Sequence, residues 1–495
     1  MQLSRQEILA VVKTLDRVYE VISNKELKIG SFLKIVPQIA NSIGVKLYPV
    51  FKDDSFFRSL FEHLQQLLSK IVSLNDSSIS FEASEIAELE RAKLIDLLEK
   101  FETSLLTCCE FYIYLHKDVS VNFPLACERV KTVTVLPESI EDLGGHLSGQ
   151  SRMSVFSVFV HTGTAQEQNG LLKQADVSYQ PDYIAGIYNR MMNELKKPDY
   201  FMYDRLYLEA KLESLKVRRD IQLLLAGSSY TMCGLLEEEM PLVARNVAVD
   251  AQDLYYTLKT IRVALELNPN ITHCIISFAY YFWGYDLSLS TSVYQYKRVT
   301  EVNYPIFKDR HNFPYELFDK NYDAIVSIPP LVRHIFSLGC FAEQYIKNVK
   351  HNLANAHYFS VPRTTSTIVT LDDTTNYERA KQRTASHNKF FKYESTVREN
   401  ISLFEGFLEE MNRKNVQIIL YVPPVTPYYR DSIDQRLISD FYTCMKPFLA
   451  KFNFKLVDLF ESDHFKNEDF VDYDHLNDQG AKKLGRILMK ELNDG

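Results

Sequence analysis

The stretch from Ile221 to Thr231 places the tightest constraint on how this chain can fold. Five of its first six residues are apolar and the run is short, which is typical of a strand buried on both faces of a parallel sheet. The run ends at Gly227, and four hydroxyl-bearing residues follow it. Ligands and catalytic groups gather at the carboxyl ends of strands in open α/β folds, so these hydroxyls mark a candidate site. A strand-to-helix turn capped by serines is the alternative that involves no chemistry.

A regular alternation of strands and helices runs from Ile221 to the C-terminus. Short apolar runs predict strands at 221–226, 243–249, 273–281, 416–422 and 454–460. Apolar residues at helical spacing predict helices at 252–267, 332–352, 377–412, 433–452 and 478–492, with a break near His387. This alternation is typical of βαβ units and a mostly parallel sheet.

The part of the chain before residue 220 has a different pattern. Amphipathic stripes predict a helical region over 1–115. Residues 116–219 are predicted to be mixed, with helix over 182–218 and a β-rich insert whose strands lie at 119–123, 130–136 and 155–160. We therefore expect three parts, at 1–115, 116–219 and 220–495, of which the last is an α/β domain.

Composition argues against several classes of function. The net charge of −8 gives no basic field that would favour nucleic acid or an anionic membrane. No apolar run approaches the roughly 18 residues of a membrane span, and the first residues lack the apolar segment of a signal peptide. The seven cysteines are scattered, without a C-x-x-C pair, which fits a reducing compartment. We expect a cytoplasmic protein with no membrane span and no nucleic-acid partner.

A second group of polar residues lies near the C-terminus. Asp472 precedes His475 by three residues, so its carboxylate can accept the imidazole Nδ1–H and leave Nε2 free as a base. Asp474 is the alternative acid if the loop turns differently. The alternative without chemistry is a helix N-terminus capped by Asn477 and Asp478.

Taken together, the two groups resemble the SGNH/GDSL hydrolase superfamily over residues 220–495. The resemblance rests on Gly227-Ser228-Ser229 after the first strand and on Asp472-x-x-His475-Leu476-Asn477-x-x-Gly480 before the last helix. It implies a flavodoxin-like (SGNH-type) three-layer α/β sandwich with a mostly parallel sheet, preceded by a largely α-helical N-terminal domain. It also implies a catalytic triad in which Ser229 is the nucleophile, His475 the general base and Asp472 the orienting acid.

The oxyanion donors depart from the family's pattern. The resemblance implies that the backbone N–H of Ser229 is one donor and that a glycine N–H in the second block is another. The second block falls at 246–253, where no glycine occurs and Ala251 is the nearest small residue. The family's asparagine after the third strand is absent, and its place is taken by aromatic residues. The side chains that could replace it are Tyr280, Tyr281 and Trp283.

The resemblance implies a serine esterase or O-acyltransferase that acts on an acetyl-type ester of a carbohydrate or small metabolite. No phosphate loop, dinucleotide fingerprint or metal-ligand pair occurs, so we expect no cofactor and no metal. The α/β-hydrolase elbow is disfavoured, because Thr231 occupies the place of its second glycine. Cys233, with no base at a recognisable spacing, is predicted to lie in a helix core.

The alternative function is a catalytically degenerate SGNH-like binding or scaffold protein in bacterial surface-polysaccharide biosynthesis. The missing asparagine and the large N-terminal region motivate it. Three short elements, Pro423-Pro424, His387-Asn388 and Glu399-Asn400, resemble SGNH-like proteins found with polysaccharide genes. In this alternative the N-terminal helices would dock a protein partner.

Overall fold

The chain divides into two compact units, each described here by itself. The structure is a computed structural model. It describes residues 5–22, 29–74, 90–91, 93–98, 100–101, 106, 110–116, 130–135, 155–160, 177–196, 199–317, 330–336, 338–356 and 371–493. The first unit comprises Met1–Pro198 and Leu317–Lys347, and the second comprises Asp199–Glu316 and Asn348–Gly495. The chain therefore passes into the second unit at 199, before the expected boundary at 220, and 317–347 returns to the first unit.

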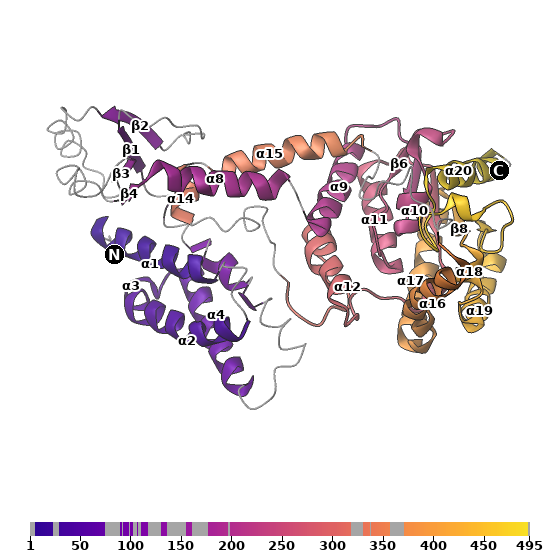
Figure 1. Ribbon diagram of the computed structural model, residues 1–495, viewed down its shortest axis with the longest axis horizontal. Helices are drawn as coiled ribbons and strands as arrows, with labels where there is room; N and C mark the ends of the chain where they lie inside the picture. The colour runs from indigo at the N-terminus through magenta and orange to yellow at the C-terminus, as the bar shows by residue number, and fades with distance from the viewer. Residues whose placement is uncertain are drawn as a thin grey trace. The chain divides into compact units, whose positions relative to one another are not determined.

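The first unit combines a helical cluster with a small parallel sheet (Figure 1). Its helices are α1 (Arg5–Ile22), α2 (Ile29–Lys46), α3 (Tyr48–Phe51), α4 (Ser55–Leu74), α8 (Pro181–Lys196) and α14 (Pro330–Ile335), and α15 (Leu338–Leu353) begins in this unit. The amphipathic stripes predicted for 1–115 form a core in which Leu15, Ile43 and Leu60 are fully buried.

The sheet of the first unit has the order β2-β1-β3-β4, and all its strands are parallel. The strands are β1 (Glu110–His116), β2 (Val130–Val135), β3 (Val155–Val160) and β4 (Val177–Tyr179). The predicted strands at 130–136 and 155–160 are confirmed, whereas 119–123 lies outside the described residues. The helical prediction is wrong over Glu110–His116, where the alternating aromatic and branched residues form the central strand β1.

The second unit is an α/β domain around a five-stranded parallel sheet of order β6-β5-β7-β8-β9. Its strands are β5 (Leu223–Ala226), β6 (Ala244–Asn246), β7 (His273–Ser277), β8 (Gln417–Val422) and β9 (Lys455–Asp458), so every strand predicted after Ile221 is confirmed. The longer helices are α9 (Tyr200–Leu215), α11 (Leu254–Leu267), α16 (Asp373–Asn388), α17 (Glu394–Arg413), α19 (Gln435–Lys451) and α20 (Asp478–Asn493). The helix predicted over 377–412 is indeed broken after His387.

Short helical segments connect these elements. They are α10 (Ser229–Gly234), η2 (Glu237–Glu239), η3 (Tyr280–Gly284), α12 (Val293–Lys297), η4 (Arg298–Asn303), α13 (Tyr304–Phe307), η7 (Lys389–Lys392), α18 (Pro427–Arg430) and η8 (Asn467–Asp469). The third strand ends at Ser277 instead of continuing to Tyr281, because the chain turns into the helical segment η3. There Gly284 passes so close to η7 that a Cβ would lie 2.0 Å from the Phe390 carbonyl oxygen.

The strand β5 lies between β6 and β7 and is fully buried, as its apolar sequence predicts. Leu223 and Leu225 pack in one cluster with Leu484 of α20. Leu224 points to the opposite face because side chains alternate along a strand, and it is equally buried. Both faces of the sheet are therefore covered, which is the usual condition of a parallel sheet.

Helix α9 belongs to the second unit, although the pattern of the sequence assigned it to the part before 220. Its Asp204 forms a buried ion pair with Arg298 of η4. The hydroxyl of Tyr207 donates to the Asn246 carbonyl at the end of β6, 3.3 Å away. These contacts are polar and join residues that are distant in sequence, so a local periodicity of apolar residues could not predict them.

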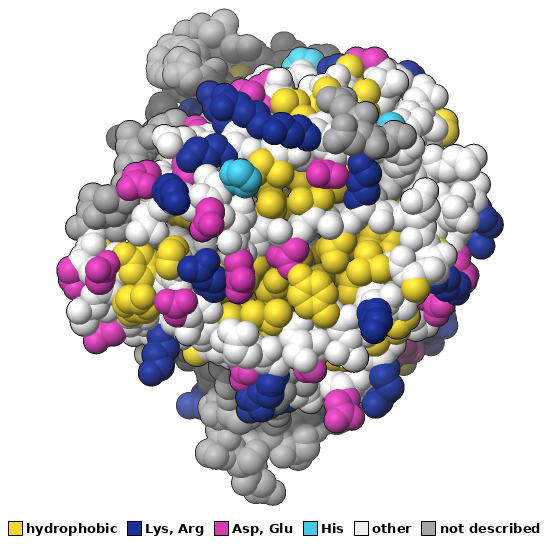
Figure 2. All heavy atoms as spheres, turned by 90° about the vertical axis from the view of Figure 1, so that its right-hand side faces the viewer, with side chains coloured by type: hydrophobic (Ala, Val, Ile, Leu, Met, Phe, Trp, Pro, Cys, Tyr) yellow, Lys and Arg dark blue, Asp and Glu magenta, His cyan; other side chains and the backbone are white. Residues whose placement is uncertain are grey.

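The surface on the side of α18, α19 and α20 mixes charges of both signs. Figure 2 shows Lys and Arg side chains interspersed with Asp and Glu around apolar side chains in the middle of this face. In the described ranges, no helix is long and apolar enough to cross a membrane.

Candidate active site

The turn after β5 presents Ser229 at the carboxyl edge of the sheet. Gly227 has φ +130°, and a Cβ there would lie 2.2 Å from Ser277 Oγ, so only glycine fits. Ser228 is the N-cap of α10 and Ser229 its first residue. The hydroxyl of Thr231 donates to the Ala226 carbonyl at 2.8 Å and ties α10 back to the strand. The chain thus holds Ser229 in a fixed turn between β5 and α10.

The loop before α20 presents His475 from the other end of the sequence. The backbone N–H of Val471 donates to the His475 carbonyl at 2.9 Å, which closes the loop on itself. The side chain of Asn477 accepts the N–H groups of Gln479 and Gly480 and so caps α20. Gly480 lies against the Asp469 carbonyl, where a Cβ would be only 2.3 Å away. The predicted Asp-x-x-His-Leu-Asn-x-x-Gly block therefore both caps the helix and orients the histidine.

The three predicted triad residues form a continuous hydrogen-bonded chain. Ser229 Oγ lies 2.8 Å from His475 Nε2. His475 Nδ1 lies 2.9 and 3.0 Å from the two carboxylate oxygens of Asp472. With Nδ1–H donated to Asp472, Nε2 is left to take the proton of the serine hydroxyl. The serine and histidine are separated by 246 positions in the sequence, and only the fold brings them together.

Asp474, the alternative acid, lies beside the same imidazole but has other partners. Its Oδ1 is 3.5 Å from His475 Nδ1, farther than either oxygen of Asp472. Nε and Nη2 of Arg383 donate to its carboxylate at 2.9 to 3.1 Å, and the Tyr230 hydroxyl donates at 2.9 Å. Of the two carboxylates, that of Asp472 therefore lies closer to the imidazole Nδ1.

The electrostatic setting of the imidazole is strongly anionic. Burial by itself lowers the pKa of His475, but the charges of Asp472 and Asp474 outweigh it and raise the pKa to about 9. Burial would raise the pKa of Asp474, yet the Arg383 guanidinium holds it well below its ordinary value. Burial, together with the charge of Asp474, raises the pKa of Tyr230, so its hydroxyl stays protonated and can donate.

The predicted backbone oxyanion donors lie at the ends of neighbouring strands. Strand β6 pairs with β5, and the turn after it contains Ala251 in a left-handed conformation with φ 51°. The carbonyl of Ala251 accepts the Tyr285 hydroxyl at 2.9 Å. Neither the Ser229 N–H nor the Ala251 N–H donates a hydrogen bond to another described residue.

The three aromatic candidates after β7 separate into two groups. The Tyr280 hydroxyl donates to Asp458 at 2.7 Å, and the Trp283 indole packs on Phe278 and other rings. Only Tyr281 among the three joins the triad's surroundings, through a hydroxyl 3.4 Å from that of Tyr230. No contact of these rings with Ser229 occurs in the described parts of the chain, so the missing asparagine has no evident side-chain replacement.

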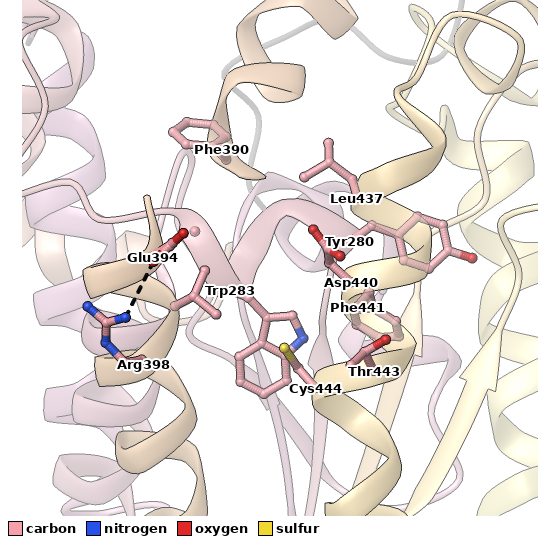
Figure 3. A pocket seen from close by; sticks show the side chains of 12 residues that line it. Tyr280, Trp283, Phe390, Glu394, Arg398, Leu437, Asp440, Phe441, Thr443 and Cys444 are labelled. Carbon is pink, nitrogen blue, oxygen red and sulfur yellow. Dashed lines mark ion pairs between the residues drawn. The ribbon is translucent and has the colours of Figure 1, made fainter. Parts of the chain in front are cut away.

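Tyr280 and Trp283 instead line a cavity of about 350 Å³ between α17 and α19 (Figure 3). Its rim carries Glu394 and Arg398, 3.5 Å apart on α17, and Asp440 on α19. None of the triad residues lines this cavity.

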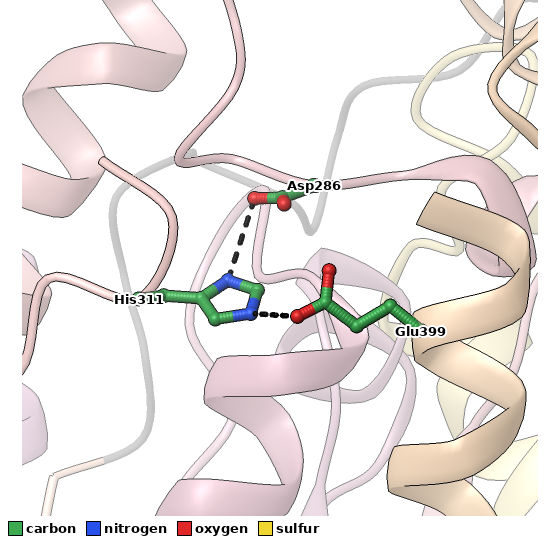
Figure 4. Close-up of side chains that lie close together, drawn as sticks. All are labelled: Asp286, His311 and Glu399. Carbon is green, nitrogen blue, oxygen red and sulfur yellow. Dashed lines mark hydrogen bonds and ion pairs between the residues drawn. The ribbon is translucent and has the colours of Figure 1, made fainter. Parts of the chain in front are cut away.

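Two groups of side chains in the described ranges bring enough oxygen and nitrogen atoms together to hold a cation. One is Asp472, Asp474 and His475, already engaged in the contacts given above. The other is Asp286, His311 and Glu399, in which the imidazole lies between two carboxylates (Figure 4). His311 Nδ1 is 3.6 Å from Asp286 and Nε2 is 3.2 Å from Glu399. Because its two nitrogens face different carboxylates, the histidine serves as an ionic bridge between them.

Sequence reasoning missed the residues that surround the base. Arg383 lies on α16, 91 positions before Asp474, on a helix whose sequence is polar throughout. His387 of the same helix stacks on Tyr281 with ring centroids 4.1 Å apart. A single arginine among many on such a helix has no local signal that distinguishes it from a solvated charge.

Neither a known family model nor a curated protein matches the chain in sequence. The site therefore has to be interpreted from its own geometry. That geometry defines an α/β protein with a hydrogen-bonded serine, histidine and aspartate at the carboxyl edge of a parallel sheet.

Proposed function

We propose that this chain is a serine esterase or O-acyltransferase of the SGNH/GDSL type, which acts on an acetyl-type ester of a carbohydrate or small metabolite. The observation that carries the proposal is the hydrogen-bonded chain from Asp472 through His475 to Ser229. Oriented this way, the imidazole can remove the serine proton as the oxygen attacks a carbonyl.

The topology of the second unit supports the same assignment. Numbered along the chain from β5, the strands of its sheet follow the order 2-1-3-4-5. This is the order of flavodoxin-like doubly wound sheets, in which ligands bind at the carboxyl ends near the switch point between the first and third strands. Ser229 follows the first of these strands directly.

The proposed reaction proceeds through an acyl-enzyme. Ser229 Oγ attacks the ester carbonyl while His475 Nε2 takes its proton, and the N–H groups of Ser229 and Ala251 stabilise the oxyanion. The tetrahedral intermediate collapses when His475 returns the proton to the leaving alcohol. Water then attacks the acyl group in an esterase, or a sugar hydroxyl does so in an acyltransferase, while His475 accepts the proton of the attacking hydroxyl. The bond between the acyl carbon and Ser229 Oγ breaks as His475 returns this proton to the serine, which restores the free enzyme.

The test is labelling of the full chain by a fluorophosphonate probe, together with hydrolysis of p-nitrophenyl acetate. Wild type should be labelled and active, and Ser229→Ala should lose both properties. Ser228→Ala is the matched control, because the hydroxyl of Ser228 is buried next to the nucleophile and has no hydrogen-bond partner among the described residues. It should retain labelling.

Two results would contradict the proposal. One is a wild-type chain that is folded by circular dichroism yet neither labelled nor active. The other is equal labelling of Ser229→Ala. The first result would favour the alternative, a degenerate SGNH-like binding or scaffold protein, which the absent oxyanion asparagine already suggests.

A further inference from the structure

A buried ion pair lies directly behind the proposed base. Asp474 is completely buried, and Arg383 binds its carboxylate through both Nε and Nη2. The side chain of Arg383 is 39% exposed, so the pair reaches from the interior towards the surface of α16. Tyr230 completes the arrangement, because its hydroxyl donates to Asp474 while its ring stacks on His475 at 5.4 Å between centroids.

Helix α16 is itself fixed at its C-terminal end. His387 Nδ1 lies 2.6 Å from the Tyr429 hydroxyl, and the side chain of Asn388 accepts the Asp434 N–H at 2.8 Å. Burial lowers the pKa of His387 to about 3, so its ring is neutral and the contact is an ordinary hydrogen bond. Arg383 is therefore presented to Asp474 by a helix with little freedom to move.

A buried carboxylate is costly unless it is paired, and removing one partner of such a pair is strongly destabilising. Asp472 alone already supplies the acceptor that the imidazole needs. A second, fully buried carboxylate 3.5 Å from the same nitrogen is thus not required for orientation along the Asp472–His475 axis. The contacts of Asp474 instead place the Arg383 guanidinium and the Tyr230 ring beside the imidazole.

We propose that Arg383 is a positioning residue of the base, which acts through Asp474 and Tyr230 to hold the His475 imidazole against Ser229. This inference rests on the proposed function and adds to it a residue from α16. Arg383 touches neither the nucleophile nor the reacting atoms. Its effect reaches the site through the carboxylate that it binds and the ring that this carboxylate anchors.

Several charged groups around the imidazole determine the pKa of His475. The charged and titratable groups that face His475 are Asp472 and Asp474 on its own loop, Arg383 and His387 on α16, Tyr230 on α10 and Asp250 after β6. Asp474 raises the pKa of His475 and Arg383 lowers it. The two members of this ion pair therefore shift the pKa of His475 in opposite directions.

The experiment compares Asp474→Asn and Arg383→Gln in the full chain. Loss of the carboxylate leaves the Arg383 charge uncompensated, so the acid limb of kcat/KM for p-nitrophenyl acetate should move to lower pH by about 1 unit. Loss of the guanidinium should move the limb to higher pH. Arg383→Lys, which keeps the charge, should restore a limb close to that of wild type.

A proton NMR titration of the His475 ring measures the same changes in pKa without any substrate. The ring signal is assigned by its loss in His475→Gln. It tests the positioning role even if no ester is turned over, so failure of the proposed function and failure of this inference are distinguishable. Arg262→Gln is the matched control, because Arg262 is a partly buried arginine that pairs with Glu410 away from the site. It should leave both the limb and the titration unchanged.

A merely structural ion pair would give a different result. Both variants would then lower the amount of folded protein and shift the His475 titration in the same direction, or not at all. Either outcome, or a shift equally large in Arg262→Gln, overturns the inference.

Discussion

Each hydroxyl after Gly227 has a different role in the fold. Ser229 contacts His475, Tyr230 donates to Asp474, and Thr231 donates to the Ala226 carbonyl. Ser228 Oγ has no partner in the described part of the chain. The four side chains therefore have different surroundings, because a helical turn points successive side chains in different directions.

At the residue scale we predict an alkaline pH optimum. Only the neutral imidazole can accept the Ser229 proton, and the adjacent carboxylates raise the pKa of His475 to about 9. The base is therefore mostly protonated at pH 7, and kcat/KM should rise with pH and reach half of its plateau near pH 9. Steady-state hydrolysis of p-nitrophenyl acetate between pH 6 and 10 checks this, after correction for spontaneous hydrolysis. A pH profile of kcat/KM with its midpoint at about 6.5, the ordinary pKa of a histidine, would contradict this prediction.

At the scale of elements, the turn between β6 and α11 is held from several sides. Asp250 accepts hydrogen bonds from Tyr200 at 2.5 Å and from Arg298 at 3.0 Å. Asp253 caps α11 by accepting the Tyr256 N–H at 2.9 Å. Between these anchors Ala251 adopts its left-handed conformation, which non-glycine residues adopt only when the surroundings impose it. The conformation of the turn is therefore fixed by the residues on either side of Ala251.

We predict that Tyr285→Phe weakens this turn and lowers kcat without changing KM. The substitution removes only the hydroxyl, which donates to the Ala251 carbonyl and accepts a longer hydrogen bond of 3.3 Å from Gln295 Nε2, and the ring keeps its contact with Phe390. A single hydrogen bond of this kind contributes about 1 kcal/mol, so kcat should fall by about fivefold. Tyr256→Phe is the matched control, because its hydroxyl also donates to a backbone carbonyl, that of Asp309. An equal loss in both variants, or a change in KM alone, would count against Ala251 as an oxyanion donor.

Most elements of the second unit could be predicted because their apolar residues recur with a clear period. Strand β5 and helices α11 and α17 are examples. Strand β7 was predicted too long, since the aromatic residues of η3 have the same β propensity as a strand. Strand β1 was missed for the opposite reason, as it follows directly on a helical pattern. Secondary-structure propensity depends on local sequence. In β1 and at the end of β7, the packing of distant segments determined the secondary structure instead.

At the scale of the molecule, the second unit depends on a helix that precedes its first strand. Asp204 of α9 and Arg298 of η4 are both almost completely buried, and they pair with each other. The ring of Tyr200 also lies 4.7 Å from the Arg298 guanidinium. Since Arg298 binds Asp250 as well, this ion pair connects α9 to the turn that contains Ala251.

We predict that Asp204→Ala destabilises the second unit by about 3–5 kcal/mol, because it leaves the Arg298 charge buried with one partner fewer. Trp283, the one tryptophan of the chain, is buried in this unit, so its fluorescence during urea unfolding reports on the second unit. Asp220→Ala, which breaks the exposed pair with Arg218, is the control and should leave the midpoint near that of wild type. An unchanged midpoint for Asp204→Ala would mean that α9 is not part of this core.

The sequence by itself determined most elements of the second unit and the identity of the three triad candidates. Buried strands have apolar runs, and the blocks around Ser229 and His475 are each local, so both could be recognised without coordinates. Only the tertiary structure decided how these blocks meet, which of two neighbouring aspartates faces the imidazole, and that Arg383 and Tyr230 support it. Hydrogen bonds and ion pairs act over a few ångströms in space and are indifferent to separation along the chain. A site assembled from such contacts therefore becomes visible only once the chain has folded.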